Sequence, residues 1–181
     1  VRDALLGRLG TDLDFTTDAQ PTRVQELLHG FVDHQWDTGI DFGTVSAVKG
    51  VEQIEITTFR TDAYDRVTRH PIVEYGTRLE DDLVRRDFTV NAMAVRIGPG
   101  GVGEFVDPLG GMDALLAGVL DTPPALPQDS FHDDPLRMLR AARFVSQLGF
   151  TLTERVHTAI EQMADEILRI SPSGCRPNST S

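Results

Sequence analysis

The sequence feature that most constrains the fold is a pair of segments, residues 44–48 and 53–59, in which β-branched residues alternate with others. This alternation is typical of strands, and Lys49-Gly50 between them is typical of a tight turn. We therefore expect two antiparallel neighbours in one sheet. Other segments extend the pattern, with strands expected at 12–17, 91–97 and 104–106 and helices at 2–6, 22–31, 79–86 and 112–116. Residues 60–77 lack a clean period and predict a loop.

Prolines at positions 123, 124 and 127 indicate a linker. Beyond it, apolar residues recur at helical spacing over 133–148 and 153–168, which predicts two helices separated at Gly149. The fold class expected from this order is mixed α/β followed by a helical piece. The corresponding domains are 1–127 and 128–170, with an unstructured tail at 171–181.

Composition limits the classes of partner. The 181 residues carry a formal net charge of −11, which excludes a protein that binds nucleic acid through an overall basic surface. All of this charge lies in residues 1–130, because residues 131–181 hold six acids and six bases. Binding of an anionic ligand therefore requires a few arginines or metal ions at the binding site itself. The single cysteine, Cys175, and the lack of a long apolar run predict a cytoplasmic protein without a membrane span.

Three carboxylates fall on predicted strands. Asp12 and Asp14 are two residues apart and so project from one face of their strand. Their mutual repulsion favours a divalent cation, and oxygen ligands suit Mg²⁺. Glu55 could complete a cluster of three. The alternative is a solvated strand edge, which is the commoner explanation of each acid taken alone.

Two further segments carry charges with possible chemical roles. Residues 85–92 place two arginines, Asp87 and Asn91 at a helix-to-strand junction, which suits either ligand binding or a helix end where Asp87 pairs with a neighbouring arginine. Residues 133–143 begin with two acids, which a helix N-terminus favours, and Asp133 could pair with Arg137. That account leaves unexplained the three-residue spacing of Arg137, Arg140 and Arg143, which suits a polyphosphate. A neighbouring acid suits a nucleobase edge.

Seven motifs occur in a fixed order between Val1 and about Ile170: Val-Arg-Asp-x-Leu-Leu-Gly, Asp-x-Asp-Phe-Thr-Thr, Thr-Thr-Phe-Arg, Arg-His-Pro, Arg-Arg-Asp-Phe-Thr-x-Asn-Ala-Met-Ala, Asp-Pro-x-Gly-Gly-x-Asp and Asp-Asp-Pro-Leu-Arg-Met-Leu-Arg-Ala-Ala-Arg-Phe. Together they resemble the bacterial family of CCA-adding tRNA nucleotidyltransferases and poly(A) polymerases. The resemblance implies a polymerase-β-like nucleotidyltransferase head, with a mixed sheet and flanking helices, followed by the start of a helical neck.

The resemblance also implies roles for individual residues. Asp12 and Asp14 would hold two Mg²⁺ ions, with Glu55 as a third catalytic carboxylate. The remaining set would bind nucleotide: Arg2 and Arg86 at the phosphates, Asp87 and Asn91 on the ribose side, Asp134 and Arg137 at the edges of C and A, and Arg140 and Arg143 at the triphosphate.

The implied reaction is stepwise transfer of CMP and AMP from CTP and ATP to the 3′ end of a tRNA. The family extends beyond both ends of this chain, with two glycines before Val1 and helical regions after Ile170, so we expect a chain truncated at both ends. Three alternatives stay open: a poly(A) polymerase of the same family, a catalytically inactive fragment, and an acidic metal-binding module without transferase chemistry.

Overall fold

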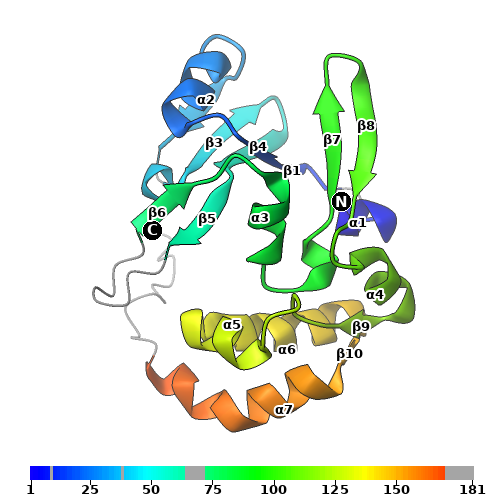
Figure 1. The fold of residues 1–181 in the computed structure, drawn as a ribbon. Helices are drawn as coiled ribbons and strands as arrows, with labels where there is room; N and C mark the ends of the chain where they lie inside the picture. Colours follow the sequence, from blue (N-terminus) through cyan, green and yellow to red (C-terminus); the bar gives the residue numbers. More distant parts are fainter. Residues whose placement is uncertain (9, 38, 64–71, 170–181) are drawn as a thin grey trace, which may run out of the picture. The chain divides into compact units, whose positions relative to one another are not determined.

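The computed structural model describes most of the chain, namely residues 1–8, 10–37, 39–63 and 72–169 (Figure 1). The chain folds into two compact units, Val1–Arg85 and Arg86–Ser181. Each unit contains both helices and strands, so the predicted mixed α/β class is confirmed. The expected boundary after residue 127 stays a prediction, and the expected tail at 171–181 lies outside the described residues.

The first unit is a mixed sheet with helices. Its elements are α1 (Arg2–Leu5), β1 (Asp12–Thr17), α2 (Pro21–Leu28), β2 (His34–Trp36), the 3-10 helix η1 (Ile40–Phe42), β3 (Thr44–Lys49), β4 (Glu52–Thr58), β5 (Arg60–Ala63), β6 (Ile72–Tyr75) and α3 (Leu79–Val84). The four-stranded sheet has the order β1-β4-β3-β2. Strands β3 and β4 form the predicted antiparallel hairpin, and β1 runs parallel to β4.

Helix α2 covers one face of this sheet (Figure 1). Proline suits its first position, because a helix leaves the first N–H groups without intrahelical partners. The apolar side of the helix joins the sheet in one core, made of Val24, Leu28, Val45, Ala47 and Ile54. Full burial of an aliphatic side chain of this kind stabilises by about 1.5–3 kcal/mol before the loss of chain entropy is counted.

The predicted loop at residues 60–77 differs in the structure. The backbones of β5 and β6 pair antiparallel, from Arg60 opposite Tyr75 to Ala63 opposite Ile72. Residues 64–71, which connect the two strands, lie outside the described residues. The paired segments are only four residues each, and strands this short leave little alternation for a sequence pattern to reveal.

A buried carboxylate connects the start of this hairpin to helix α3. Asp82 is fully buried, and its Oδ1 accepts hydrogen bonds from the backbone N–H of Arg60 at 3.3 Å and from Nη2 of Arg85 at 2.6 Å. A buried carboxylate without partners costs several kcal/mol. Because moving α3 away from β5 would leave Asp82 without one of its partners, these bonds hold the helix against the strand.

The second unit combines a hairpin, short parallel strands and helices. Its elements are η2 (Thr89–Asn91), β7 (Ala94–Gly98), β8 (Gly101–Val106), α4 (Gly111–Ala117), β9 (Val119–Leu120), α5 (Pro127–Asp133), α6 (Leu136–Leu148), β10 (Thr151–Leu152), α7 (Glu154–Met163) and η3 (Ala164–Arg169). The strand predicted from residue 91 begins later, at Ala94, because Asn91 ends a 3-10 turn. Strands β9 and β10 pair in parallel and tie the linker region to the start of α7.

Helices α5, α6 and α7 share a core made of Phe131, Met138, Val156 and Ala159. The sequence predicts one helix beginning at Asp133, and this boundary is wrong. Helix α5 already begins at Pro127 and ends at Asp133, and α6 begins at Leu136. The reason is Pro135, since a proline disfavours the helical conformation in the residue before it, and Asp134 is extended with φ −143° and ψ 94°.

Helix α4 packs directly on the backbone of η2. Asp107 caps the helix start, with Oδ1 accepting from Gly111 N at 2.7 Å and Oδ2 from Met112 N at 2.8 Å. A Cβ added at Gly111 would lie 2.3 Å from the carbonyl oxygen of Thr89. Only glycine allows α4 to approach η2 this closely.

We expect Gly111→Ala to destabilise the chain by about 2–3 kcal/mol, because the Thr89 carbonyl belongs to the backbone and cannot rotate away. Urea unfolding of the purified chain measures the loss. Gly98→Ala is the matched control, since a Cβ there meets open space, and it is expected to change stability by less than about 1 kcal/mol. Equal losses in both variants would contradict the close approach.

Candidate functional site

The three predicted catalytic carboxylates lie on neighbouring strands of the first unit. In the parallel register, Asp14 is beside Glu55 and Asp12 is beside Gln53. Residues paired in this way point to the same face, opposite to Ile54 in the core. Asp12, Asp14 and Glu55 are all exposed. The strand pairing thus places three acids at one polar surface of the sheet.

The paired acids fit a divalent cation that also binds a ligand. Mg²⁺ in proteins usually keeps several waters and takes one or two carboxylates plus substrate phosphates. Asp12 and Asp14 are two exposed oxygen donors of this kind on one strand face. Within the described residues, no group of three or more His, Cys, Asp and Glu side chains is arranged to hold a metal. The third carboxylate role of Glu55 stays a prediction.

Arg2, a predicted phosphate contact, is bound to its neighbour in helix α1. Its Nη2 lies 2.9 Å from Oδ1 and 2.7 Å from Oδ2 of Asp3, and its Nε donates to Oδ1 at 3.0 Å. These hydrogen bonds lower the pKa of the Asp3 carboxyl, against a smaller opposing effect of burial. The guanidinium is oriented by this pair, so an anionic ligand would compete with Asp3 for it.

In the second unit, Asp87 connects three parts of the chain. The carboxylate is 8% exposed, and its Oδ1 accepts from Phe88 N at 2.8 Å and from Asn91 Nδ2 at 2.9 Å. Its Oδ2 accepts from Nε of Arg140 at 2.7 Å. Two predicted site segments that are far apart in the sequence are therefore bonded to each other. The alternative in which Asp87 pairs with a neighbouring arginine is wrong for Arg85, which binds Asp82 instead.

The ring of Phe144 supports two arginines of helix α6. The guanidinium carbon of Arg140 lies 5.5 Å from the ring centroid and that of Arg143 lies 5.1 Å from it. Phe144 in turn packs edge-to-face against Phe88, with centroids 5.8 Å apart. Cation–π contacts of this kind contribute about 0.5–2 kcal/mol and orient the guanidinium groups. Arg140 and Arg143 are thereby presented on the exposed side of α6.

Asp134 and Arg137 lie at the start of α6. Asp134 Oδ1 accepts from Leu136 N at 3.0 Å, so this carboxylate caps the helix. Arg137 Nη1 donates to Ser130 Oγ at 2.6 Å, which orients the guanidinium toward α5. Asp133 is in the last turn of α5, so it does not have the expected i, i+4 relation to Arg137 in one helix. Arg86, the remaining predicted contact, is half-buried at the start of the second unit.

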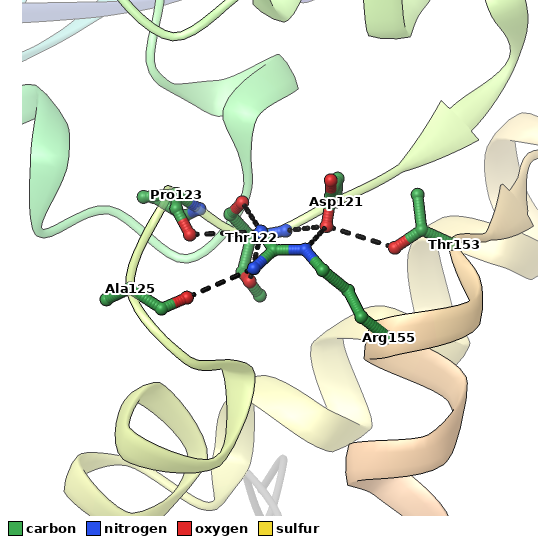
Figure 2. A network of polar contacts seen from close by, with 6 residues as sticks. All are labelled: Asp121, Thr122, Pro123, Ala125, Thr153 and Arg155. Carbon is green, nitrogen blue, oxygen red and sulfur yellow. Dashed lines mark hydrogen bonds and ion pairs between the residues drawn. The ribbon is translucent and has the colours of Figure 1, made fainter.

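The sequence analysis overlooked a residue that organises the linker before α5. Arg155, on α7, hydrogen-bonds Asp121 and the backbone carbonyls of Thr122, Pro123 and Ala125 (Figure 2). Adjacent prolines were the signal available in the sequence, because a segment poor in N–H groups and rich in carbonyls requires a donor from elsewhere.

The helices of the described part of the chain are all too short or too polar to cross a bilayer.

Comparison with known proteins identifies relatives of both units. The CCA-adding enzyme of Lactobacillus helveticus is 41% identical over 172 residues, which are 94% of this chain and 41% of that protein. The CCA-adding enzyme of Geobacillus kaustophilus is 42% identical over 172 residues, 94% of this chain and 40% of that protein. The chain thus spans about two fifths of the length of the curated relatives it matches.

Solved structures show the same fold. The Bacillus stearothermophilus CCA-adding enzyme in complex with CTP superposes with a TM-score of 0.78 and 38% identity, over 94% of this chain and 39% of that one. A tRNA nucleotidyltransferase complexed with a primer tRNA and an incoming ATP analog gives a TM-score of 0.71 at 32% identity, over 92% of this chain and 45% of that one. The fold is that of a nucleotidyltransferase head, as predicted.

The family described as the poly A polymerase head domain matches residues 1–121, and the chain belongs to this family. The resemblance inferred from the motifs is confirmed. Nucleotidyltransferases of this kind generally use divalent metal ions, which agrees with the exposed pair of acids on β1.

We expect Arg140→Gln to destabilise the chain by about 1–2 kcal/mol, because it leaves the nearly buried Asp87 carboxylate without its charged partner. Arg143→Gln removes the same charge from an exposed position one turn further on, and is expected to cost about 0.5 kcal/mol or less. Thermal unfolding of both variants measures the difference. A smaller loss for Arg140→Gln than for Arg143→Gln would contradict the assigned pair.

Proposed function

We propose that the complete protein containing this chain is a tRNA nucleotidyltransferase that adds CMP and AMP, from CTP and ATP, to the tRNA 3′ end. The observation that carries the proposal is the similarity to CCA-adding enzymes over 94% of the chain, including one solved with CTP. A further relative was solved with a primer tRNA and an ATP analog, which supports tRNA and both nucleotides as partners. A cytoplasmic location belongs to the same proposal, since a tRNA substrate and a single cysteine suit a reducing compartment.

The domain assignment is part of the proposal. Residues 1–127 form the catalytic head and residues 128–170 begin the neck, and residues 171–181 are assigned to neither. The shared core of α5, α6 and α7 supports a helical piece that begins after the linker. The family match over residues 1–121 supports a head that ends near the same linker.

Asp12 and Asp14 would hold two Mg²⁺ ions, with Glu55 contributing from the adjacent strand. Bound ions would increase the nucleophilicity of a 3′-hydroxyl and neutralise the leaving pyrophosphate. The protein's own contribution is geometric: the parallel pairing of β1 with β4 fixes the acids at one surface, on strands whose opposite face is anchored in the core.

The nucleotide-binding residues of the second unit divide by chemistry. Asp134 can accept from an exocyclic amine and Arg137 can donate to ring acceptors, and both are positioned at the start of α6 by local hydrogen bonds. Arg140 and Arg143 supply positive charge for the triphosphate. Asp87 orients Asn91, whose amide would face the ribose. Arg2 and Arg86 would contribute at the phosphates.

The reaction is tested on the complete protein with a tRNA that lacks its terminal CCA. We expect CMP incorporation with CTP alone, followed by AMP incorporation when ATP is added, as in the relatives named CCA-adding enzymes. Gel analysis of the extended tRNA measures both steps. Incorporation of AMP only, whichever nucleotide is offered first, would instead identify a poly(A) polymerase of the same family.

Nucleotide binding by the 181-residue chain itself is tested by calorimetric titration with CTP and ATP in the presence of Mg²⁺. We expect micromolar binding, and we expect the double variant Asp12→Ala, Asp14→Ala to weaken it at least about tenfold because the cation loses both carboxylates. Asp18→Ala removes an exposed acid just after β1 and is the control without an expected effect. A wild-type chain that binds neither nucleotide would favour the alternative of an inactive fragment.

A further inference from the structure

Arg155 makes an unusual concentration of hydrogen bonds to one short segment (Figure 2). Its Nε donates to Asp121 Oδ1 at 2.7 Å, its Nη1 donates to Ala125 O at 3.1 Å, and its Nη2 donates to Pro123 O at 3.1 Å. Nη2 also donates to the carbonyl and, at 3.1 Å, to the hydroxyl of Thr122. We call this arrangement, together with Thr153, the Arg155 clamp. All three nitrogens of one guanidinium are used to hold residues 121–125 against α7.

The segment needs this donor because it has few N–H groups of its own to satisfy its carbonyl oxygens. It lies between β9 and α5 without regular structure, and two of its residues, Pro123 and Pro124, have no N–H group. Thr122 is 2% exposed, so its carbonyl and hydroxyl have little access to water. A planar guanidinium with five N–H donors can satisfy several such acceptors at once, which an ammonium on a flexible stem cannot do in the same geometry.

The same segment reaches the proposed nucleotide site through Asp121. Its Oδ1 also accepts from Thr153 Oγ1 at 3.0 Å and from Thr122 N at 2.9 Å, which fixes the residue in place. Its backbone oxygen accepts from Thr89 N at 2.9 Å. Thr89 is the first residue of η2, the turn that ends at Asn91. The clamp therefore fixes the Asp121 backbone oxygen, which accepts the hydrogen bond from the first residue of η2.

The turn and helix α6 meet at one carboxylate. Asp87 Oδ1 accepts from the amide of Asn91, and Asp87 Oδ2 accepts from Arg140. A displacement of η2 would thus move Asn91 and disturb the partner that orients Arg140. A continuous series of hydrogen bonds connects Arg155 with both groups: guanidinium to Asp121, Asp121 to Thr89, and η2 through Asp87 to α6.

We propose that Arg155 is a positioning residue for nucleotide binding, which acts through Asp121 and Thr89 on the Asp87–Asn91 turn and has no contact with the nucleotide itself. This inference rests on the proposed function for its effect on affinity. Its structural half, the dependence of the turn on Arg155, can be measured without any nucleotide.

The test uses three variants of the 181-residue chain: Arg155→Gln, Arg155→Lys and, as control, Arg96→Gln. Arg96 is in the same unit and 60% exposed, so its loss removes an equal charge from the surface. Calorimetric titration gives the dissociation constants for CTP and ATP with Mg²⁺. The side-chain amide resonances of Asn91 in ¹H–¹⁵N spectra, assigned by Asn91→Asp, report on the turn without nucleotide.

We expect Arg155→Gln to raise the dissociation constants about fivefold to tenfold and to shift the Asn91 amide resonances, at temperatures where the variant remains folded by circular dichroism. Arg155→Lys is expected to fail to rescue either property, because the charge alone cannot bond several carbonyls. Arg96→Gln should leave affinity within about twofold and the Asn91 resonances unchanged. If Arg155→Gln is too unstable, Asp121→Asn, which removes the charged partner but keeps an acceptor oxygen, takes its place and should shift the same resonances.

The possible outcomes separate the two proposals. Unchanged Asn91 resonances in a folded Arg155→Gln or Asp121→Asn variant would overturn the positioning role, whatever the affinity. Shifted resonances with unchanged affinity would also overturn it. A wild-type chain that binds neither nucleotide would favour the inactive fragment, and the affinities of the same variants would then be measured on the complete protein, while shifted resonances would still support the dependence of the turn on Arg155. Further support would come from a double variant, Arg155→Gln with Arg140→Gln, whose loss of affinity is smaller than the product of the single losses.

Discussion

The organisation of the second unit depends on how the Asp87 carboxylate is satisfied. A nearly buried carboxylate is costly unless each oxygen has partners, and here one oxygen binds the turn that follows while the other binds α6. The requirement brings together two motifs that the sequence separates widely. Because Phe88 follows Asp87 directly and packs on Phe144, an apolar contact reinforces the ionic one.

The charge distribution agrees with a site built from individual arginines. The excess of acids lies in residues 1–130, so the first unit has no overall attraction for a polyanion. Its exposed pair of acids on β1 suits a cation, and the arginines of α6 are oriented by an aromatic ring, a hydroxyl and a carboxylate. An anionic ligand would therefore be bound by individually oriented arginines and a cation, and not by the overall charge of the protein.

Sequence patterns predicted the parts of this structure that depend on neighbours in the chain. The β3–β4 hairpin followed from alternation around Lys49-Gly50, and the strand that carries Asp12 and Asp14 followed from the same period. Strand β2 was missed because all three of its residues are exposed, which leaves no alternation to detect. The bonds of Asp87 with Arg140 and of Arg155 with the linker join residues thirty or more positions apart, and no local period encodes such pairs. The motif resemblance gave Asp87 and Arg140 roles in binding the same nucleotide, but it did not predict that the two side chains are bonded to each other.

The Arg155 clamp also bears on how far the head can be treated as an independent module. The family match ends at Asp121, inside the set of residues that Arg155 holds, and β9 just before it relies on β10 for its parallel partner. A protein cut at that position would expose Leu120, a residue with no accessible surface in the intact unit, and would strip Asp121 of every side-chain donor. The evolutionary border and the physical border of the head thus differ, and any exchange of heads between relatives would have to carry α7 along with it.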